Sequence, residues 1–483
     1  RPLAAQEARI AFVAGYAAYP KGPLKTALND AGLVADSLRS IGFTIVETAD
    51  ANKPLFQQRY EDFLTRLKEA GPSATAFVYI SGYGLAIEGE NYLLPSDARA
   101  DRESDIAAQA IPLSQLLDPL AALPARARVF VFDAARPLPF RWPGRPLAPG
   151  LEMIQAPAGT LVGFASGPGT VIEDSPQAYG IYAAAIAEMV RSPGLDLDAI
   201  FTRIRARTHQ ATQGKETPWH MSAIREPAQL SPVDAAPSVP ARARRSGTPM
   251  RDIGPDEAYA LAIERDTLEG YADFIEAYPR HPYVRRLFQL LRSRREAMAW
   301  LRANQMNTPP AYWTYLKLYP RGLYAFDAER KLKRAGAAAT APADFTPIVF
   351  DGVPPPLSGE PEDYIGGYDD APAPPASLIE PAAPPFQKLP PPRPRPGALP
   401  STLALPAGLQ VPPAQPVTAS EPAAPSAAAS RGNASRNNAT PKRERRTEPP
   451  PRRPQPAPRE TVPRGPGQPL SCEIVNGMRF CRW

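Results

Sequence analysis

Strand-like and helix-like segments alternate along residues 8–225, and this alternation limits the possible folds more than any other feature of the sequence. Short apolar runs such as Arg9–Ala14 and Arg128–Asp133 are typical of buried strands. The segment from Leu24 to Ile41 instead carries its apolar residues at helical spacing. Strands that alternate with helices favour a mostly parallel sheet with helices on both faces. We therefore predict an α/β domain over residues 8–225.

The expected elements place two loops at one edge of this sheet. We expect strands over residues 9–14, 43–47, 74–81, 128–133 and 160–165, and helices over residues 24–41, 53–69, 113–122, 179–190 and 195–212. In such sheets, ligands bind beyond the carboxyl ends of the strands. Ser81–Gly84 and Asp133–Arg136 leave those ends, so a site is expected there.

A second, all-helical unit is expected over residues 251–335, after a linker rich in Pro, Ala and Arg at residues 226–250. It contains an internal repeat in which a set of aromatic residues recurs 41 positions later. The first set is Tyr271, Phe274, Tyr278-Pro279-Arg280 and Tyr283, and the second is Tyr312, Tyr315, Tyr319-Pro320-Arg321 and Tyr324. Two helices around a Tyr-Pro turn, repeated about every 40 residues, resemble tetratricopeptide-like repeats. We expect these aromatic residues to form a core between the helices.

Residues 336–470 hold about half of the 64 prolines of the chain, together with many Ala, Ser and Arg residues. Such a composition buries too little apolar surface to fold, so we predict a disordered tail. Pro390–Pro396 has the composition of segments that bind aromatic-lined grooves, and a plain spacer is the alternative. The Arg-rich stretch 431–464 is expected to contact anionic envelope polymers. It lacks interleaved aromatic residues, so no specific nucleic-acid site is predicted.

The only two cysteines, Cys472 and Cys481, lie within residues 471–483. Between them Asn476-Gly477 is a strong signal for a two-residue hairpin turn, and pairing outward from it sets the cysteines opposite each other. We predict a disulfide, with two free thiols as the alternative. A disulfide requires an oxidising compartment.

The chain begins Arg1-Pro2-Leu3, as after removal of a signal peptide or of another leading segment. No apolar run is long enough to span a membrane. We expect a periplasmic or secreted bacterial protein.

Several segments resemble bacterial domains of the caspase/metacaspase superfamily: Arg9–Gly15, Asn29-Asp30, Gly89–Pro95, Phe132–Ala134 and Pro218-Trp219. The resemblance covers most of residues 8–225 and implies the caspase fold. Its cysteine endopeptidases use a Cys–His dyad. The histidine lies in a Ser-Gly-His-Gly turn after the third strand, and the cysteine in an Asp-Ala-Cys-Arg turn after the fourth.

In this chain the two turns read Ser81-Gly82-Tyr83-Gly84 and Asp133-Ala134-Ala135-Arg136, so Tyr83 and Ala135 take the dyad positions. An alanine methyl cannot replace a thiolate nucleophile. A tyrosine titrates near pH ~10 and is a poor base at neutral pH. The sequence has three histidines, and each is expected on a surface or in a packed core rather than in these turns: His209, His220 and His281.

The resemblance still leaves a candidate peptide-binding cleft. Its candidate residues are Gly82, Tyr83, Gly84, Asp97, Asp133, Ala135 and Arg136. Backbone N–H groups near Gly84 and Ala135 are suited to bind a carbonyl oxygen. Asp97 and Asp133 are the carboxylates expected nearest the cleft, to receive a basic side chain or to serve as turn caps.

We therefore predict a catalytically inactive caspase-like protein that is exported and acts as a peptide-binding, protein-binding or scaffold module. Neither a cofactor nor a metal is expected. One alternative is a hydrolase of the same family that uses another nucleophile, Ser81 or Ser166. A second alternative is an envelope-associated structural protein that acts through its repeats and tail.

Overall fold

The computed structural model describes residues 7–99, 101–142, 147–231, 249–357, 360, 373–375, 389–393, 471–475 and 478–482. Contacts divide the chain into two compact units, residues 1–403 and residues 404–483. Most of the tail predicted as disordered, and residues 232–248 of the linker, lie outside the described residues.

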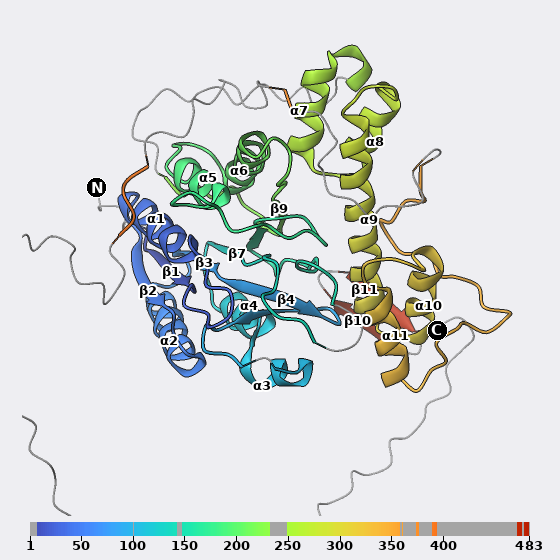
Figure 1. Cartoon of the computed structure of the whole chain (residues 1–483), viewed down its shortest axis with the longest axis horizontal. Helices are drawn as coiled ribbons and strands as arrows, with labels where there is room; N and C mark the ends of the chain where they lie inside the picture. Colours follow the sequence, from blue (N-terminus) through green and yellow to red (C-terminus); the bar gives the residue numbers. More distant parts are fainter. Residues whose placement is uncertain are drawn as a thin grey trace, which may run out of the picture. The chain divides into compact units, whose positions relative to one another are not determined.

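A six-stranded sheet forms the centre of the first unit (Figure 1). In spatial order its strands are β2 (Thr44–Ala49), β1 (Arg9–Gly15), β3 (Thr75–Ser81), β7 (Ala127–Asp133), β8 (Thr160–Phe164) and β9 (Trp219–Ser222). All neighbours pair in parallel except β8 and β9, which are antiparallel. The two central strands, β3 and β7, are buried at every position, because helices cover both faces of the sheet. The predicted α/β sheet is confirmed.

Two groups of helices cover the two faces of this sheet (Figure 1). One face packs against α1 (Ala27–Ser40), α5 (Ile181–Met189) and α6 (Leu197–Ala211). The other face packs against α2 (Lys53–Ala70) and α4 (Ser114–Ala122). Side-chain caps fix two of the helix starts: Asn52 accepts the N–H of Leu55, and Asp196 accepts the N–H of Ala199. The bounds of these five helices agree to within a few residues with those predicted from apolar spacing.

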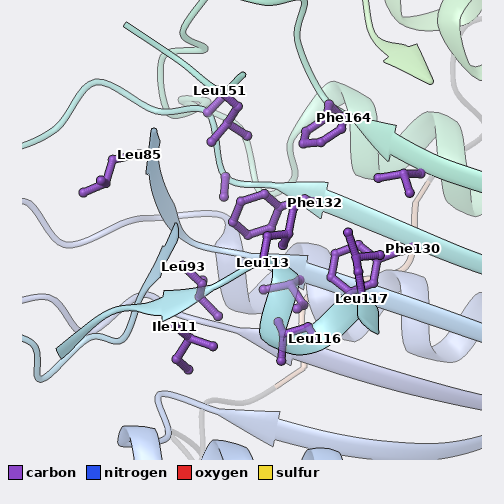
Figure 2. Packing of buried hydrophobic residues seen from close by; sticks show 14 of the residues in the cluster. Leu85, Leu93, Ile111, Leu113, Leu116, Leu117, Phe130, Phe132, Leu151 and Phe164 are labelled. Atoms are coloured by element: carbon purple, nitrogen blue, oxygen red, sulfur yellow. The ribbon is translucent and has the colours of Figure 1, made fainter. Parts of the chain in front are cut away.

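A small antiparallel sheet, which the sequence did not predict, follows β3 directly. It consists of β4 (Tyr83–Ile87), β5 (Glu90–Leu94) and β6 (Ile111–Pro112), with a 3₁₀ turn at Glu103–Asp105 and the short helix α3 (Ile106–Gln109) before β6. Glu88 and Gly89 both take positive φ angles, of 52° and 95°, and form the tight β4–β5 turn. Figure 2 shows how Leu85 and Leu93 of this sheet and Leu116 and Leu117 of α4 lie around Phe130 and Phe132 of β7. The small sheet thus extends the main core past the carboxyl ends of the central strands.

The expected helical region is present. After a 3₁₀ turn at Met250–Asp252, its helices are α7 (Pro255–Arg265), α8 (Leu268–Ala277), α9 (Val284–Met306), α10 (Pro309–Leu318) and α11 (Ala325–Arg334). The structure extends the repeat seen in the sequence. Asp266 and Asn307, which are 41 positions apart, both end a helix in the left-handed conformation, with φ of 47° and 48°. Their side chains accept hydrogen bonds from the phenols of Tyr271 and Tyr312, respectively.

The helical region extends beyond its predicted end at residue 335. Phe350 is buried, the ring of Phe345 lies edge-on to Trp313, and the N–H of Ile348 donates to Thr314 Oγ1 over 3.1 Å. These apolar residues bury enough surface to hold the first part of the predicted tail against α10. In the part of the chain that the structure describes, no helix is long and apolar enough to cross a membrane.

In the second unit, β10 (Ser471–Val475) and β11 (Met478–Arg482) form an antiparallel hairpin. The backbone register pairs Cys472 with Cys481, as expected from the Asn-Gly signal. The turn residues 476 and 477 and the side chains of the hairpin lie outside the described residues, so the disulfide itself stays a prediction.

Candidate functional site

The two turns singled out in the sequence meet at the carboxyl edge of the central sheet. The parallel register of β3 and β7 ends with Ser81 opposite Asp133. The N–H of Gly82 donates to the carbonyl of Asp133 over 3.3 Å, and the N–H of Gly84 donates to the carbonyl of Ala134 over 2.7 Å. The turns that carry Tyr83 and Ala135 are therefore hydrogen-bonded to each other. The N–H of Gly84, expected to bind a ligand carbonyl, is already engaged inside the protein.

Tyr83 is held by aromatic and polar contacts on the side of the loop after β1. Its ring lies edge-on to Tyr19 with centroids 4.7 Å apart, and its phenol donates to the carbonyl of Gly22 over 3.0 Å. Burial raises the pKa of the Tyr83 phenol, and the nearby carboxylate of Asp174 raises it further. The phenol therefore stays protonated at neutral pH, where it can donate a hydrogen bond but cannot serve as a general base.

Ala135 lies beneath the loop that follows β8. Only 1% of its surface is exposed, and its carbonyl accepts the N–H of Ile172 over 2.7 Å. The far end of this loop, residues 165–180, is bound to the start of α1. There Asp174 accepts the N–H of Lys25 over 2.6 Å, and Asn29 donates to the carbonyl of Ala178 over 2.8 Å. We call residues 165–180 the covering loop, because it closes the carboxyl edge of the sheet above Ala135.

Asp133 and Arg136 belong to a buried charge cluster beneath the turns rather than to an open cleft. Arg136 Nη1 donates to Asp133 Oδ1 over 3.1 Å, and Arg136 Nη2 lies 3.9 Å from Asp30 Oδ2. The phenol of Tyr79 donates to the other oxygen of Asp133 over 2.7 Å. Burial raises the pKa of Asp30 to about 7, and the neighbouring carboxylate of Asp133 adds to this shift. Asp133 is thus occupied by internal donors, which differs from the expected role in receiving a basic side chain.

The remaining candidates from the sequence, Asp97, Ser81 and Ser166, do not form a catalytic group with one another. Asp97 is exposed in the turn after β5. Ser81 is fully buried with its hydroxyl 3.4 Å from Arg136 Nη2, and the hydroxyl of Ser166 donates to the carbonyl of Thr170 over 2.8 Å. Within the described residues, neither hydroxyl is hydrogen-bonded to a histidine, which a serine nucleophile would need.

Two of the three histidines are buried where α6 meets the helical region and β9. His209 contacts the hydroxyls of Thr217 and Tyr259 over 2.8 and 2.7 Å. His220 contacts Arg205 over 2.8 Å. Burial lowers the pKa of both rings to about 3, so both stay neutral at physiological pH. Both are packing residues, as expected from the sequence.

Glu152, a buried carboxylate at the contact between the α/β domain and the helical region, was not among the site residues predicted from the sequence. Only 1% of its surface is exposed, and it lies on the segment between β7 and β8. Its two carboxylate oxygens accept the N–H of Gly89 over 3.2 Å and the indole N–H of Trp300 on α9. Its backbone also exchanges two hydrogen bonds of 2.9 Å with the side chain of Asn91. A lone glutamate in an apolar stretch was the only signal for this role.

Further contacts hold the helical region against the loops at this edge of the sheet. Ser293 of α9 donates to the carbonyl of Pro168 in the covering loop over 2.9 Å. Arg330 and Arg334 of α11 pair with Glu88 of the β4–β5 turn at 3.1 and 2.7 Å. The helical region therefore packs on the segment after β7 and on the covering loop after β8, the places where a ligand of such a sheet would bind.

Among the residues that the structure describes, no group of three or more His, Cys, Asp or Glu side chains is arranged to hold a metal ion.

A mostly parallel sheet between two helical layers, with two hydrogen-bonded turns at its carboxyl edge, defines a caspase-like α/β domain. The family model described as the caspase domain matches residues 8–229. Residues 8–229 therefore form a caspase-like domain.

Two solved structures of caspases are similar to this chain. Caspase-1 from Spodoptera frugiperda is 14% identical, with 48% of this chain and 92% of that chain covered and a TM-score of 0.35. The Drosophila initiator caspase Dronc is 13% identical, with 46% and 82% covered and a TM-score of 0.33. No curated protein matches the chain.

Proposed function

We propose that this protein is a catalytically inactive caspase-like protein that is exported and acts as a binding or scaffold module. The observation that carries the proposal is the pairing of the Tyr83 and Ala135 turns by backbone hydrogen bonds, since these residues take the dyad positions of the resembling enzymes. A methyl group and a protonated phenol provide neither a nucleophile nor a base. The only sulfhydryl residues of the sequence, Cys472 and Cys481, belong to the second unit.

The buried surroundings of the two turns support a structural role for them. Tyr83 and Ala135 are 5% and 1% exposed, and the covering loop is bonded at Ala135 and at the start of α1. A peptide would need this loop to open before it could reach Ala135. Binding at the outer surfaces of the folded unit is therefore better supported than binding in the former cleft.

The proposal of export rests on the hairpin of the second unit. Its register sets Cys472 opposite Cys481, the arrangement in which a cross-strand disulfide forms without moving the backbone. A disulfide of this kind persists in the periplasm or outside the cell.

A peptidase assay tests the loss of catalysis. Purified full-length protein is incubated with fluorogenic peptides that carry Arg, Lys or Asp before the scissile bond. We expect no turnover by the wild-type chain or by Tyr83→Phe, and no labelling by a fluorophosphonate probe. The hydrolase alternative would be established by turnover of a particular kind. Such turnover would persist in Ala135→Gly and would be lost in Ser81→Ala or Ser166→Ala.

A second variant tests whether the turns are those of the dyad. Tyr83→His combined with Ala135→Cys restores both chemical groups at the two positions. Labelling of the new thiol by a peptidyl chloromethyl ketone, faster in the double variant than in Ala135→Cys alone, is expected if the imidazole reaches the thiol. Equal rates in the two variants would show that positions 83 and 135 do not form a dyad.

A further inference from the structure

A short polyproline segment from the C-terminal part of the first unit lies against the α/β domain. Residues 389–393 read Leu-Pro-Pro-Pro-Arg and contact α1, β2, α5 and Tyr179, which lies two residues before α5. The residues immediately before and after this segment lie outside the described residues.

The segment makes three chemically different contacts. Leu389 packs against an apolar cluster of Leu33, Tyr179 and Ala187. The carbonyl of Pro390 accepts the phenol hydrogen of Tyr179 over 2.8 Å. At the other end, the Arg393 guanidinium binds the carboxylates of Asp36 and Glu47.

Arg393 forms a forked ion pair with α1 and β2. Its Nε donates to Asp36 Oδ2 over 2.9 Å, its Nη2 donates to the other oxygen of Asp36, and its Nη1 donates to Glu47 Oε2 over 2.9 Å. Bidentate contacts of this kind need the planar fork of arginine and are lost with lysine. A Cβ on Gly32 would lie 3.5 Å from Arg393 Cδ, so the arginine stem lies along the α1 backbone at a position without a side chain.

Arg393 neutralises the remaining negative charge of Asp36 and Glu47. Arg39, at the end of α1, also binds Asp36 at 2.6 Å and Glu47 at 2.5 Å. Two carboxylates and one guanidinium leave a net charge of −1 when Arg393 is away, counted over the side chains named here. The pKa of Asp36 is lowered, with the Arg393 hydrogen bond as the largest cause. We call the surface formed by Leu33, Asp36, Glu47, Tyr179 and Ala187 the polyproline-docking surface.

This combination suits a polyproline segment better than other extended chains. A polyproline helix makes no internal hydrogen bonds, so its carbonyls are open to an outside donor such as the Tyr179 phenol. An aromatic hydroxyl for the carbonyl and an acidic pair for a flanking arginine fix both the register and the direction of such a segment. The chain itself holds a second Pro-Pro-Pro-Arg sequence at Pro449–Arg452, which lies outside the described residues.

We propose that the polyproline-docking surface is a specific binding site for Leu-Pro-Pro-Pro-Arg segments, and that the chain's own residues 389–393 occupy it in cis. The site lies on the outer surface of α1 and β2 and does not depend on whether the turns at Tyr83 and Ala135 are active. Because the segment is tethered to the same chain, it binds at an effective concentration on the order of millimolar. A partner segment of the same chemistry therefore binds only in competition with residues 389–393.

Competition in full-length protein tests the site. The probe is a fluorescein-labelled peptide of residues 386–396, and its anisotropy is followed at low ionic strength. Arg393→Ala together with Arg452→Ala removes the arginine of both internal copies, and we expect the peptide to bind this chain about tenfold or more tightly than the wild-type chain. The unlabelled peptide should compete, whereas the same peptide with alanine in place of its Pro-Pro-Pro-Arg arginine should not.

Variants of the surface separate specific docking from attraction to an acidic protein. In the Arg393→Ala/Arg452→Ala chain, Asp36→Asn with Glu47→Gln should abolish peptide binding, and Tyr179→Phe should weaken it. Asp62→Asn, an exposed acid on α2, is the matched control and should leave binding unchanged. Asp36 and Glu47 have side chains 47% and 37% exposed, so their replacement leaves the core intact. Absence of binding to the Arg393→Ala/Arg452→Ala chain, or binding that survives the loss of both carboxylates, would overturn the proposal.

Discussion

The indole N–H of Trp300 on α9 donates to the buried carboxylate of Glu152, on the segment that joins β7 to β8. This bond connects two parts of the chain that are 148 positions apart. It lies in one continuous apolar cluster that extends from the sheet to α9, α10 and α11. The helical region is thus built into the same core as the α/β domain.

Trp300→Phe should detach part of this contact. The change removes the indole donor and leaves one carboxylate oxygen of Glu152 buried without that partner, which costs about 1–3 kcal/mol. We expect a lower free energy of unfolding in urea and faster hydrogen exchange in residues 147–159. Trp313→Phe is the matched control, because the half-buried Trp313 donates only to the carbonyl of Ala338 over 2.9 Å. Equal losses in the two variants would contradict the special role of Trp300.

The stability of the protein should depend on pH through Glu152. Burial raises the pKa of this carboxyl to about 8, although the Trp300 and Gly89 donors act in the opposite direction. Its pKa in the unfolded chain is about 4.3. Between these pH values the folded state holds a proton that the unfolded state has lost. The contribution of Glu152 to the free energy of unfolding is therefore complete below about pH 4 and falls as the pH rises toward 8.

Glu152→Gln removes this dependence because the amide does not titrate. The slope of the free energy of unfolding against pH should become less negative by up to about 1.4 kcal/mol per pH unit between pH 5 and pH 8. Asp30 and Asp327, with pKa values raised to about 7 and about 6, contribute slopes of the same sign that remain in the variant. Urea titrations at several pH values measure the difference, and Glu61→Gln on the exposed side of α2 serves as the control. Parallel pH profiles of wild type and Glu152→Gln would refute the assignment.

The covering loop should protect position 135 from reagents. In a background that carries Cys472→Ser and Cys481→Ser, Ala135→Cys places the only thiol of the chain under Ile172. Alkylation by iodoacetamide should be at least about tenfold slower than for Ala18→Cys, since the buried thiol reacts only when the loop opens locally. Ala18 is exposed and provides the unprotected reference rate. Similar rates at both positions would show that the edge of the sheet is open in solution.

The equivalent tyrosine hydrogen bonds in the two copies of the helical repeat should contribute different free energies to stability. The phenol of Tyr271 donates to Asp266, a carboxylate that also pairs with Arg205 and Arg294 at 3.2 and 3.1 Å. The equivalent phenol of Tyr312 donates to the neutral amide of Asn307 over 2.7 Å. A hydrogen bond to a charged acceptor is worth about 1.5–3 kcal/mol against about 0.5–1.5 kcal/mol for a neutral one. Tyr271→Phe should therefore lower the free energy of unfolding more than Tyr312→Phe, and the reverse order would contradict this reading.

The hairpin of the second unit should contain a disulfide. Mass spectrometry of the unreduced protein should find Cys472 and Cys481 in one cross-linked peptide, and a thiol reagent should detect no free sulfhydryl before reduction. Cys472→Ser should expose the thiol of Cys481 to the same reagent. Two reactive thiols in protein purified from an oxidising compartment would remove the basis for the proposed export.

Local patterns predicted five of the six strands of the main sheet, and the short antiparallel strand β9 was not predicted. Arg9–Gly15 and Ala127–Asp133 are mostly apolar and lie where expected, and the Asn476-Gly477 pair predicted the register of the hairpin. The small sheet was missed because β4 and β5 are short, and β6 has two residues. Its turn has Glu88 rather than glycine or asparagine at the first positive-φ position, so the usual turn signal is absent.

Contacts between distant segments could not be predicted from local patterns. Glu152 reads as one acid among apolar residues, and its partners Gly89 and Trp300 are 63 and 148 positions away. Asp133 looked accessible at a strand end, but Arg136 and Tyr79 satisfy it internally. The composition of Pro390–Pro396 leaves two interpretations open, a ligand for an aromatic-lined groove and a plain spacer. The contact of Pro390 with Tyr179 of the same chain depends on the tertiary structure.

The buried cluster of Arg136, Asp133 and Asp30 restricts which replacements the turn at residues 133–136 tolerates. The side chain at position 135 is a methyl group without polar partners, so small residues can exchange there at little cost to folding. Position 136 has no such freedom, because removal of Arg136 leaves two buried carboxylates without their shared cation, at a cost of about 3–5 kcal/mol. Removal of Asp133 takes away the carboxylate nearest to Arg136 and leaves only Asp30 at 3.9 Å. The residue at position 135 can therefore change in one step without loss of the fold, since the ion pair that supports the turn does not involve it.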